Sequence, residues 1–174
     1  MNICFETEYD LQTLTAMAKC LRKTVRKKRS RRTHAFAALV SVLALSMLAA
    51  RLHRKEPFDL KSAVTLLAAA AIMAASLFED RLNAWVGKRG MLPGMGKTIT
   101  TFTEDHYTLK TDVTESQFSF SQILAIAETA RYFVFALSEN QAQAYEKASI
   151  SGGTLADFRA FIARKTGKEI QRIK

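Results

Sequence analysis

Two long apolar stretches stand out in the first half of the chain. With His34 neutral, no charged residue occurs between positions 33 and 50 or between positions 62 and 78. At about 1.5 Å of rise per residue, each stretch makes roughly 25–27 Å of helix, which is within the range of membrane-spanning helices. Charged residues would interrupt the solvent side of a soluble amphipathic helix. The pattern therefore predicts a transmembrane hairpin over residues 33–80, with spans at 33–50 and 62–78.

Before the hairpin, the pattern predicts a short strand and an amphipathic helix within residues 1–32. Ile3 and Phe5 alternate with polar positions, as on one face of a strand, and Asp10 stands where a helix N-cap is expected. Apolar positions then recur at helical spacing, namely Leu11, Leu14, Met17, Ala18, Leu21 and Val25. We expect this helix to run into a basic stretch and to lead to the first span.

After the hairpin, the period of the apolar positions changes to two, which predicts short strands. The expected strands are 98–103, 107–111, 114–120, 125–129, 132–137 and 142–145. Thr154 is then expected to cap a helix with Leu155, Phe158, Phe161 and Ile162 on one side. The chain is therefore predicted to be α+β, with a domain over residues 98–174 in which a split barrel or curved sheet is plugged by one helix.

Residues 81–97 are expected to form a linker between the hairpin and the C-terminal domain. The segment from 87 to 96 contains four of the seven glycines of the chain, a composition typical of loops. Its end, Gly96-Lys97-Thr98, resembles the last residues of a phosphate-binding loop. Such a loop requires a glycine where this chain has Met91, so we expect no nucleotide site here.

The net charge is concentrated next to the first apolar stretch. The chain has 174 residues, with 26 Lys and Arg against 16 Asp and Glu, which gives a net charge of +10. Nine of the bases and no acid lie between positions 19 and 34, whereas residues 98–174 are neutral. A nucleic-acid-binding domain would carry its positive charge on the folded domain, so we expect no nucleic acid partner. Bases clustered before an apolar run instead place that side in the cytoplasm, and both termini with it.

The basic stretch is also expected to contact anionic lipid head groups, because each Lys or Arg near such a surface gains about 1 kcal/mol. The residues expected at the membrane surface are Arg26, Lys27, Lys28, Arg29, Arg31 and Arg32. Trp85, just beyond the second apolar stretch, is expected to act as an interfacial anchor.

Small residues in the second apolar stretch would let helices approach closely. These residues are Ala68, Ala69, Ala70, Ala71, Ala74 and Ala75. They fit a hairpin that packs on itself, and equally a face that docks a partner span, including one from a second copy of the chain.

No residue pattern indicates a catalytic, cofactor-binding or metal-binding site. Cys4 and Cys20 match neither a zinc spacing nor a disulfide framework. The three histidines, His34, His53 and His106, lie far apart and lack the spacing of metal ligands. We therefore expect a protein without enzymatic activity, without a cofactor and without a metal ion.

Several motifs in the C-terminal half resemble the YcxB-like family. They are Phe102-Thr103-Glu104-Asp105-His106-Tyr107, Phe118-Ser119-Phe120-Ser121-Gln122-Ile123, Glu128-Thr129-Ala130-Arg131-Tyr132-Phe133 and Tyr145-Glu146-Lys147-Ala148, with Phe158 and Phe161 in the closing helix. Glu146 departs from the pattern, since the family usually has Pro before this Lys. The layout of the arm and the paired spans fits the same family. The resemblance implies two membrane spans and a cytoplasmic domain of pleckstrin-homology-like form, and it implies no enzymatic activity.

These observations lead us to expect a multi-pass protein of the bacterial inner membrane. Its pleckstrin-homology-like domain would capture a protein partner through a sheet edge or through the groove beside the closing helix. Two alternatives stay open. One is self-protection (immunity) or accommodation of envelope stress by the membrane part, and the other is sensing of anionic lipid by the polybasic arm.

Overall fold

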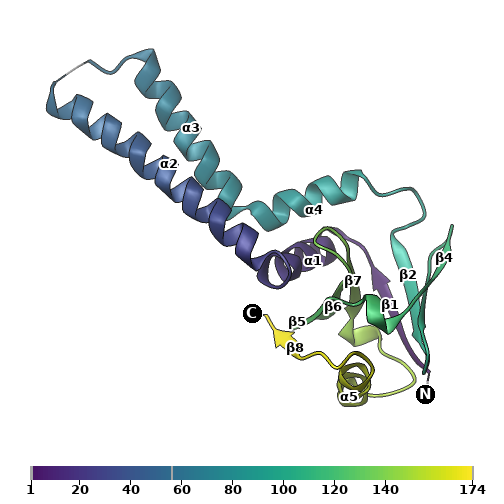
Figure 1. Cartoon of the computed structure of the whole chain (residues 1–174). Coiled ribbons are helices and arrows are strands. Elements are labelled where there is room, and N and C mark those ends of the chain that lie inside the picture. The colour runs from purple at the N-terminus through teal and green to yellow at the C-terminus, as the bar shows by residue number, and fades with distance from the viewer. Residues whose placement is uncertain (1, 56, 174) are drawn as a thin grey trace.

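The computed structural model describes residues 2–55 and 57–173 and shows two long helices that project from a β-domain (Figure 1). In chain order the elements are β1 (Ile3–Glu8), α1 (Leu11–Lys23), α2 (Lys27–His53), α3 (Leu60–Leu77), α4 (Glu79–Arg89), β2 (Lys97–Phe102), β3 (Tyr107–Lys110), β4 (Glu115–Phe118), β5 (Ala125–Glu128), β6 (Tyr132–Ala136), β7 (Ala142–Glu146), α5 (Leu155–Thr166) and β8 (Ile170–Arg172). Short 3₁₀ helices lie at Phe120–Gln122 and Lys147–Ser149. The α+β class and the predicted order of strands are confirmed, and β8 is a strand that the sequence pattern did not indicate.

The β-domain consists of two four-stranded sheets with the orders β1-β2-β3-β4 and β7-β6-β5-β8. Neighbouring strands are antiparallel except β5 and β8, which are parallel. β1 pairs with β2 from Ile3 opposite Phe102 to Glu8 opposite Lys97. The N-terminal strand is thus built into the same sheet as the strand that follows the helices, so the helical hairpin is an insertion within the chain of the β-domain.

Aromatic side chains from both sheets and from α5 fill the core of the β-domain. Phe158 of α5 lies 4.7 Å from Phe5, 4.9 Å from Phe102 and 5.1 Å from Phe133, measured between ring centroids, and each pair packs edge to face. All four rings are fully buried. Edge-to-face contacts of this kind add to the gain from apolar burial. α5 therefore closes the space between the two sheets, as the sequence predicted for a plugging helix.

The segment before α5 holds the edge of β1. Cys4 and Ser151 exchange two backbone hydrogen bonds, both of 2.9 Å. The next residue, Gly152, has a φ of +78°, and a Cβ at this position would overlap the carbonyl oxygen of Asn2. Only glycine meets both demands at once, the left-handed backbone and the close approach.

α1 connects the β-domain to the helical hairpin. Its start is the predicted cap, in which Asp10 Oδ1 accepts a 2.7 Å hydrogen bond from the Thr13 amide. Cys20 on α1 packs against the second sheet, and burial raises the pKa of its thiol to about 12. On its other side α1 packs along α4, where the Arg22 guanidinium donates to both oxygens of Asp80 at 2.7 and 2.6 Å. These contacts fix the base of the hairpin to the β-domain.

As predicted, α1 runs into the basic stretch and leads to the first apolar stretch, but the two are separate helices. α1 ends at Lys23, and α2 begins at Lys27 after a corner. Thr24 leaves the helical region with φ −107° and ψ −94°, and its hydroxyl donates to the Cys20 carbonyl at 2.7 Å. The Thr24 amide donates to the same carbonyl at 2.9 Å, so Thr24 closes the last turn of α1 before the chain changes direction.

α2 and α3 form a hairpin whose contact face is lined by small residues. Ser30, Ala37 and Ser41 of α2 and Ser62 and Ala69 of α3 are buried. Their spacing of four or seven residues is that of a coiled-coil seam. Of the six alanines expected to permit close approach, Ala69 is the buried one, because it alone lies on this seam.

The outer end of the hairpin is tied by a cap. Asp59 Oδ1 accepts from the Ser62 amide at 2.9 Å and from an Arg51 guanidinium nitrogen at 2.7 Å. The last turn of α2 is thereby joined to the first turn of α3.

α4 occupies most of the segment that was expected to be a linker. The helix runs to Arg89, so that residues 90–96 alone form the connection to β2. Ala84 is buried against α1, whereas Leu82 and Trp85 are about half exposed. α4 turns away sharply from α3 and runs alongside α1, which lies between α4 and the strands of the β-domain (Figure 1).

Candidate functional site

The densest positive charge lies where the hairpin leaves the β-domain. We call residues 22–32, which join the end of α1 to the start of α2, the basic corner. It contains eight Lys and Arg residues and no acid. The helix break places these residues on two sides of a turn instead of along a single helix, and different parts of the corner therefore meet different neighbours.

One part of the basic corner is bound by the turn between β6 and β7. The Arg26 guanidinium donates to the Glu139 carbonyl oxygen at 2.5 Å and to Asn140 Oδ1 at 2.6 Å. Arg29 lies 3.6 Å from the Glu139 carboxylate in an exposed ion pair. Both residues were expected to contact the membrane surface; in the structure they contact the turn between β6 and β7 and so join the hairpin to the β-domain.

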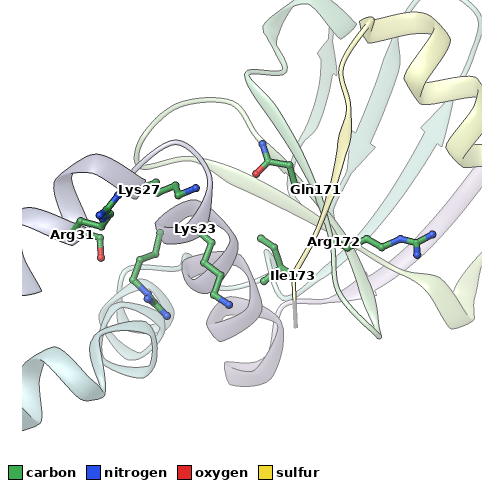
Figure 2. Close-up of a pocket in the computed structure, with 8 residues that line it drawn as sticks. Lys23, Lys27, Arg31, Gln171, Arg172 and Ile173 are labelled. Atoms are coloured by element: carbon green, nitrogen blue, oxygen red, sulfur yellow. The ribbon is translucent and has the colours of Figure 1, made fainter.

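A second part of the basic corner faces β8 across a pocket of about 390 Å³ (Figure 2). The pocket is lined by Arg22, Lys23, Lys27, Ser30, Arg31, Gln171, Arg172 and Ile173. Lys27 extends toward β8, whereas the Arg172 side chain points away from the helices (Figure 2). None of the eight residues is acidic, and Lys23, Lys27 and Arg31 are basic residues of the helical side that do not pair with Asp80, so the pocket suits an anion.

Charge compensation differs among the residues of this pocket. Arg22 is neutralised by Asp80, and the hydrogen bonds that the guanidinium donates to this carboxylate raise the pKa of Arg22. Lys27 and Arg31 are exposed, and among the described residues no carboxylate lies within ion-pair distance of either. The remaining two expected surface residues, Lys28 and Arg32, line a neighbouring groove with Lys27. The sequence predicted a cluster of bases but not this division.

A Ser-His-Glu cluster, which the sequence analysis did not find, lies at the base of the hairpin. Ser30 Oγ lies 3.2 Å from His34 Nδ1, and His34 Nε2 lies 3.7 Å from Glu79 Oε2. His34 Nδ1 also lies 2.8 Å from the Ser30 carbonyl oxygen, a contact that requires a hydrogen on Nδ1. Nδ1 then cannot take a proton from the serine hydroxyl, so the cluster is a polar link between α2 and α4 rather than a nucleophile with its base.

The motifs that resemble the YcxB-like family form ion pairs between elements of the β-domain. Glu128 on β5 accepts two hydrogen bonds from Arg159 of α5, at 3.0 and 2.7 Å, and one from Lys147 at 2.5 Å. Its side chain is 8% exposed, and the hydrogen bonds from Arg159 lower the pKa of Glu128 to about 2. The same motifs supply core rings, since Tyr107 stacks on Phe118 at 5.3 Å.

Glu146, which stands where the family usually has Pro, also has a structural role. Its carboxylate pairs with Arg131 at 2.8 Å, and its backbone amide donates to Thr7 Oγ1 at 3.0 Å. Proline has no amide hydrogen, so this link between β7 and β1 depends on the departure from the family pattern.

Within the described residues, no group of three or more His, Cys, Asp or Glu side chains lies close enough to hold a metal ion. At neutral pH the buried Cys20 thiol stays protonated, because burial disfavours its thiolate. The basic corner and its pocket therefore remain the candidate site, and the chemistry they offer is the binding of anions.

Comparison with known proteins finds one family match, within the β-domain. Residues 102–162 match the family model described as YcxB-like protein, in agreement with the resemblance of the sequence motifs. The matched segment is about a third of the chain and runs from the end of β2 into α5. It does not include α1 or the helical hairpin. No curated protein and no solved structure matches the chain.

Proposed function

We propose that this YcxB-like chain is a non-catalytic binding module of the bacterial inner membrane, anchored by α2 and α3 as two spans. One observation carries the proposal. Both helices are long and apolar enough to cross a membrane, yet only 11% of the apolar segment of each is buried. A core helix of a soluble protein is mostly buried, so these two helices need an apolar surrounding that the rest of the chain does not supply.

The distribution of side chains around the hairpin supports the same proposal. The residues buried between α2 and α3 are small, whereas large apolar residues such as Phe36 and Leu67 are 68% and 71% exposed. Lipid can cover large apolar side chains, and small residues let two helix backbones approach closely. This arrangement is the reverse of a soluble core and fits a hairpin surrounded by acyl chains.

The sheet pairing supports two crossings rather than one. β1 precedes the hairpin and β2 follows it, yet the two strands pair along six residues. Both strands must therefore lie on the same side of a membrane, which requires the chain to cross an even number of times. The basic corner lies on that side, and the excess of bases assigns it to the cytoplasm.

We further propose that exposed bases of the corner lie at the level of the head groups. Lys27, Lys28, Arg31 and Arg32 all precede position 33, where the uncharged stretch begins. At about 1.5 Å per residue, they lie within roughly 10 Å of its start along the helix. Attraction to anionic lipids acts over such distances.

The edge of the first sheet supports capture of a protein partner. β4 pairs with β3 on one side only, and among the described residues its backbone makes no hydrogen bond outside that pairing. Glu115, Ser116 and Gln117 are exposed. An open edge of this kind can accept an additional strand from another protein.

The spans and their orientation are tested by labelling in intact cells. In a chain whose Cys4 and Cys20 are replaced by Ala, Phe58→Cys places a thiol in the hairpin loop and Val113→Cys places one in the exposed turn before β4. A maleimide that does not cross membranes should label Phe58→Cys in cells whose outer membrane is permeabilised, and Val113→Cys only after the inner membrane is broken. Labelling of Val113→Cys before that step would contradict the proposed orientation.

The binding edge is tested by photo-crosslinking from the full chain in its membrane. A photoreactive amino acid at Gln117, on β4, should yield a discrete crosslinked product, whereas the same group at Arg164, on the exposed side of α5, should not. A product from position 164 alone would favour the groove beside α5 and overturn the assignment to β4.

A further inference from the structure

We propose that α4 lies flat in the interface between head groups and acyl chains, as a surface helix that sets the orientation of the β-domain. Its apolar side is formed by Phe78, Leu82, Trp85 and Val86, which are 47% to 62% exposed. We call these four residues the interfacial face. The inference rests on the proposed membrane spans and adds a second membrane contact to them.

The interfacial face follows from the helical period. Leu82, Trp85 and Val86 follow Phe78 by four, seven and eight residues, which places the four side chains along one side of the helix. The other side faces α1, where Ala84 is 2% exposed. α4 is thus an amphipathic helix whose small-residue side contacts α1 and whose large apolar side is about half exposed.

The position of α4 identifies lipid as the partner of this face. α3 ends at Leu77 and α4 begins at Glu79, so Phe78 continues the exposed apolar surface of α3 into the interfacial face. α1 and the β-domain lie on one side of α4 (Figure 1), the side on which Ala84 is buried. A helix at this place reaches the membrane surface as soon as α3 leaves the bilayer.

Charged residues around α4 fit an anionic surface. The exposed Arg89 places its guanidinium 3.6 Å from the centre of the Trp85 ring. Arg81 and Lys88 are exposed on the flank of α4 that lines a pocket with α1. A tryptophan with a stacked arginine combines an apolar ring with a cation for the head groups. Bases beside a large apolar face are typical of helices that lie in the plane of a membrane.

The contact has a consequence for the β-domain. α1 packs against α4 on one side and against β6 and β7 on the other. The ion pair between Arg22 and Asp80 fixes the first of these two contacts. A helix held at the surface would therefore hold the second sheet close to the membrane.

Trp85 is the one tryptophan of the chain, so its fluorescence reports on α4 without a competing signal. The full chain is reconstituted into vesicles of phosphatidylcholine and phosphatidylglycerol that contain brominated lipid, with the bromine either near the head group or near the middle of the acyl chain. Because an interfacial helix lies about 5–10 Å into the boundary of head groups and chains, the shallow bromine should quench Trp85 more strongly than the deep one. Iodide in the water should quench it weakly.

Two control chains keep the outcomes separate, both in a Trp85→Phe background. Val42→Trp places the fluorophore on the exposed side of α2 in the middle of the first span, and the deep bromine should quench it more strongly. Val113→Trp places it on the β-domain, where iodide should quench it and neither bromine should. If iodide rather than bromine quenches Trp85 while the deep bromine quenches Val42→Trp, the inference about α4 is overturned and the proposed spans are not. Absence of lipid quenching for Val42→Trp would overturn the proposed spans as well.

Discussion

The carboxylate of Glu128 permits a quantitative test of what holds the β-domain together. It accepts hydrogen bonds from Arg159 on α5 and from Lys147 after β7, while Glu128 itself lies on β5. Its side chain is 8% exposed, and the pKa of Glu128 lies at about 2 because Arg159 stabilises the charged form. We predict that Glu128→Gln destabilises the domain, because the amide lacks the charge and leaves the largely buried Lys147 and the partly exposed Arg159 without their carboxylate.

The magnitude follows from the pKa. Its fall from the ordinary value of 4.5 to about 2 corresponds to roughly 3 kcal/mol of folding free energy, at about 1.4 kcal/mol per pKa unit. Since the pKa is lower in the folded state, this contribution is complete above about pH 5 and is lost as the pH falls from about 4.5 to about 2. Glu128→Gln should therefore reduce the free energy of unfolding at pH 7 by roughly 3 kcal/mol. As the pH falls toward 2, the free energies of unfolding of the variant and of the unmodified chain should approach each other.

Urea unfolding of the full chain in a non-ionic detergent, followed by near-ultraviolet circular dichroism of the aromatic core, measures the effect. Glu104→Gln is the matched control, because the Glu104 carboxylate is half exposed and pairs with Lys165. This exposed pair should contribute no more than about 1 kcal/mol. Equal midpoints for Glu128→Gln and the unmodified chain at pH 7, or equal losses in both variants, would refute the reasoning.

Three further predictions use the same unfolding assay. Gly152→Ala should destabilise the chain by more than the roughly 1–2 kcal/mol of a left-handed alanine, because its Cβ also overlaps the backbone before β1, whereas Gly167→Ala, with open space around it, should cost only the backbone term. Tyr107→Phe should leave the stability unchanged or raise it, because this buried hydroxyl has no hydrogen-bond partner among the described residues; Tyr145→Phe, which loses a 2.7 Å hydrogen bond, should cost about 1 kcal/mol. Arg22→Gln should lower the free energy of unfolding by about 2 kcal/mol. A double-mutant cycle with Asp80, its partner on α4, should show a coupling energy between the two side chains, which a packing contact without an ion pair would lack.

The local elements of the fold were predicted because their causes are local. An uncharged run of about 18 residues determines a long apolar helix, and alternation over four to six residues determines a strand. Asp10 and Thr154 each cap a helix through contacts with residues three positions ahead. Such causes can be found within a window of a few residues, whatever the rest of the chain does.

The candidate site was predicted only in part. The sequence shows that the basic corner exists, but not that Thr24 breaks the helix or that Glu139 binds two of its arginines. The pocket with β8 joins residues about 140 positions apart in the chain, and nothing in the local pattern connects them. Each base of the corner contacts a different neighbour, and the packing of the helices against the β-domain determines which one.

The sequence by itself thus determined the two apolar helices, most of the strands and the placement of charge. Tertiary structure decided that β1 pairs with β2 across an insertion of nearly ninety residues, and that α4 is a helix rather than a linker. Both outcomes depend on packing between distant segments, because Phe5 is buried only where it meets Phe102 and Phe158, and Ala84 only where α4 meets α1. The periodicity of the sequence indicates which side of an element is apolar, but the segment that covers this side is determined by the tertiary structure.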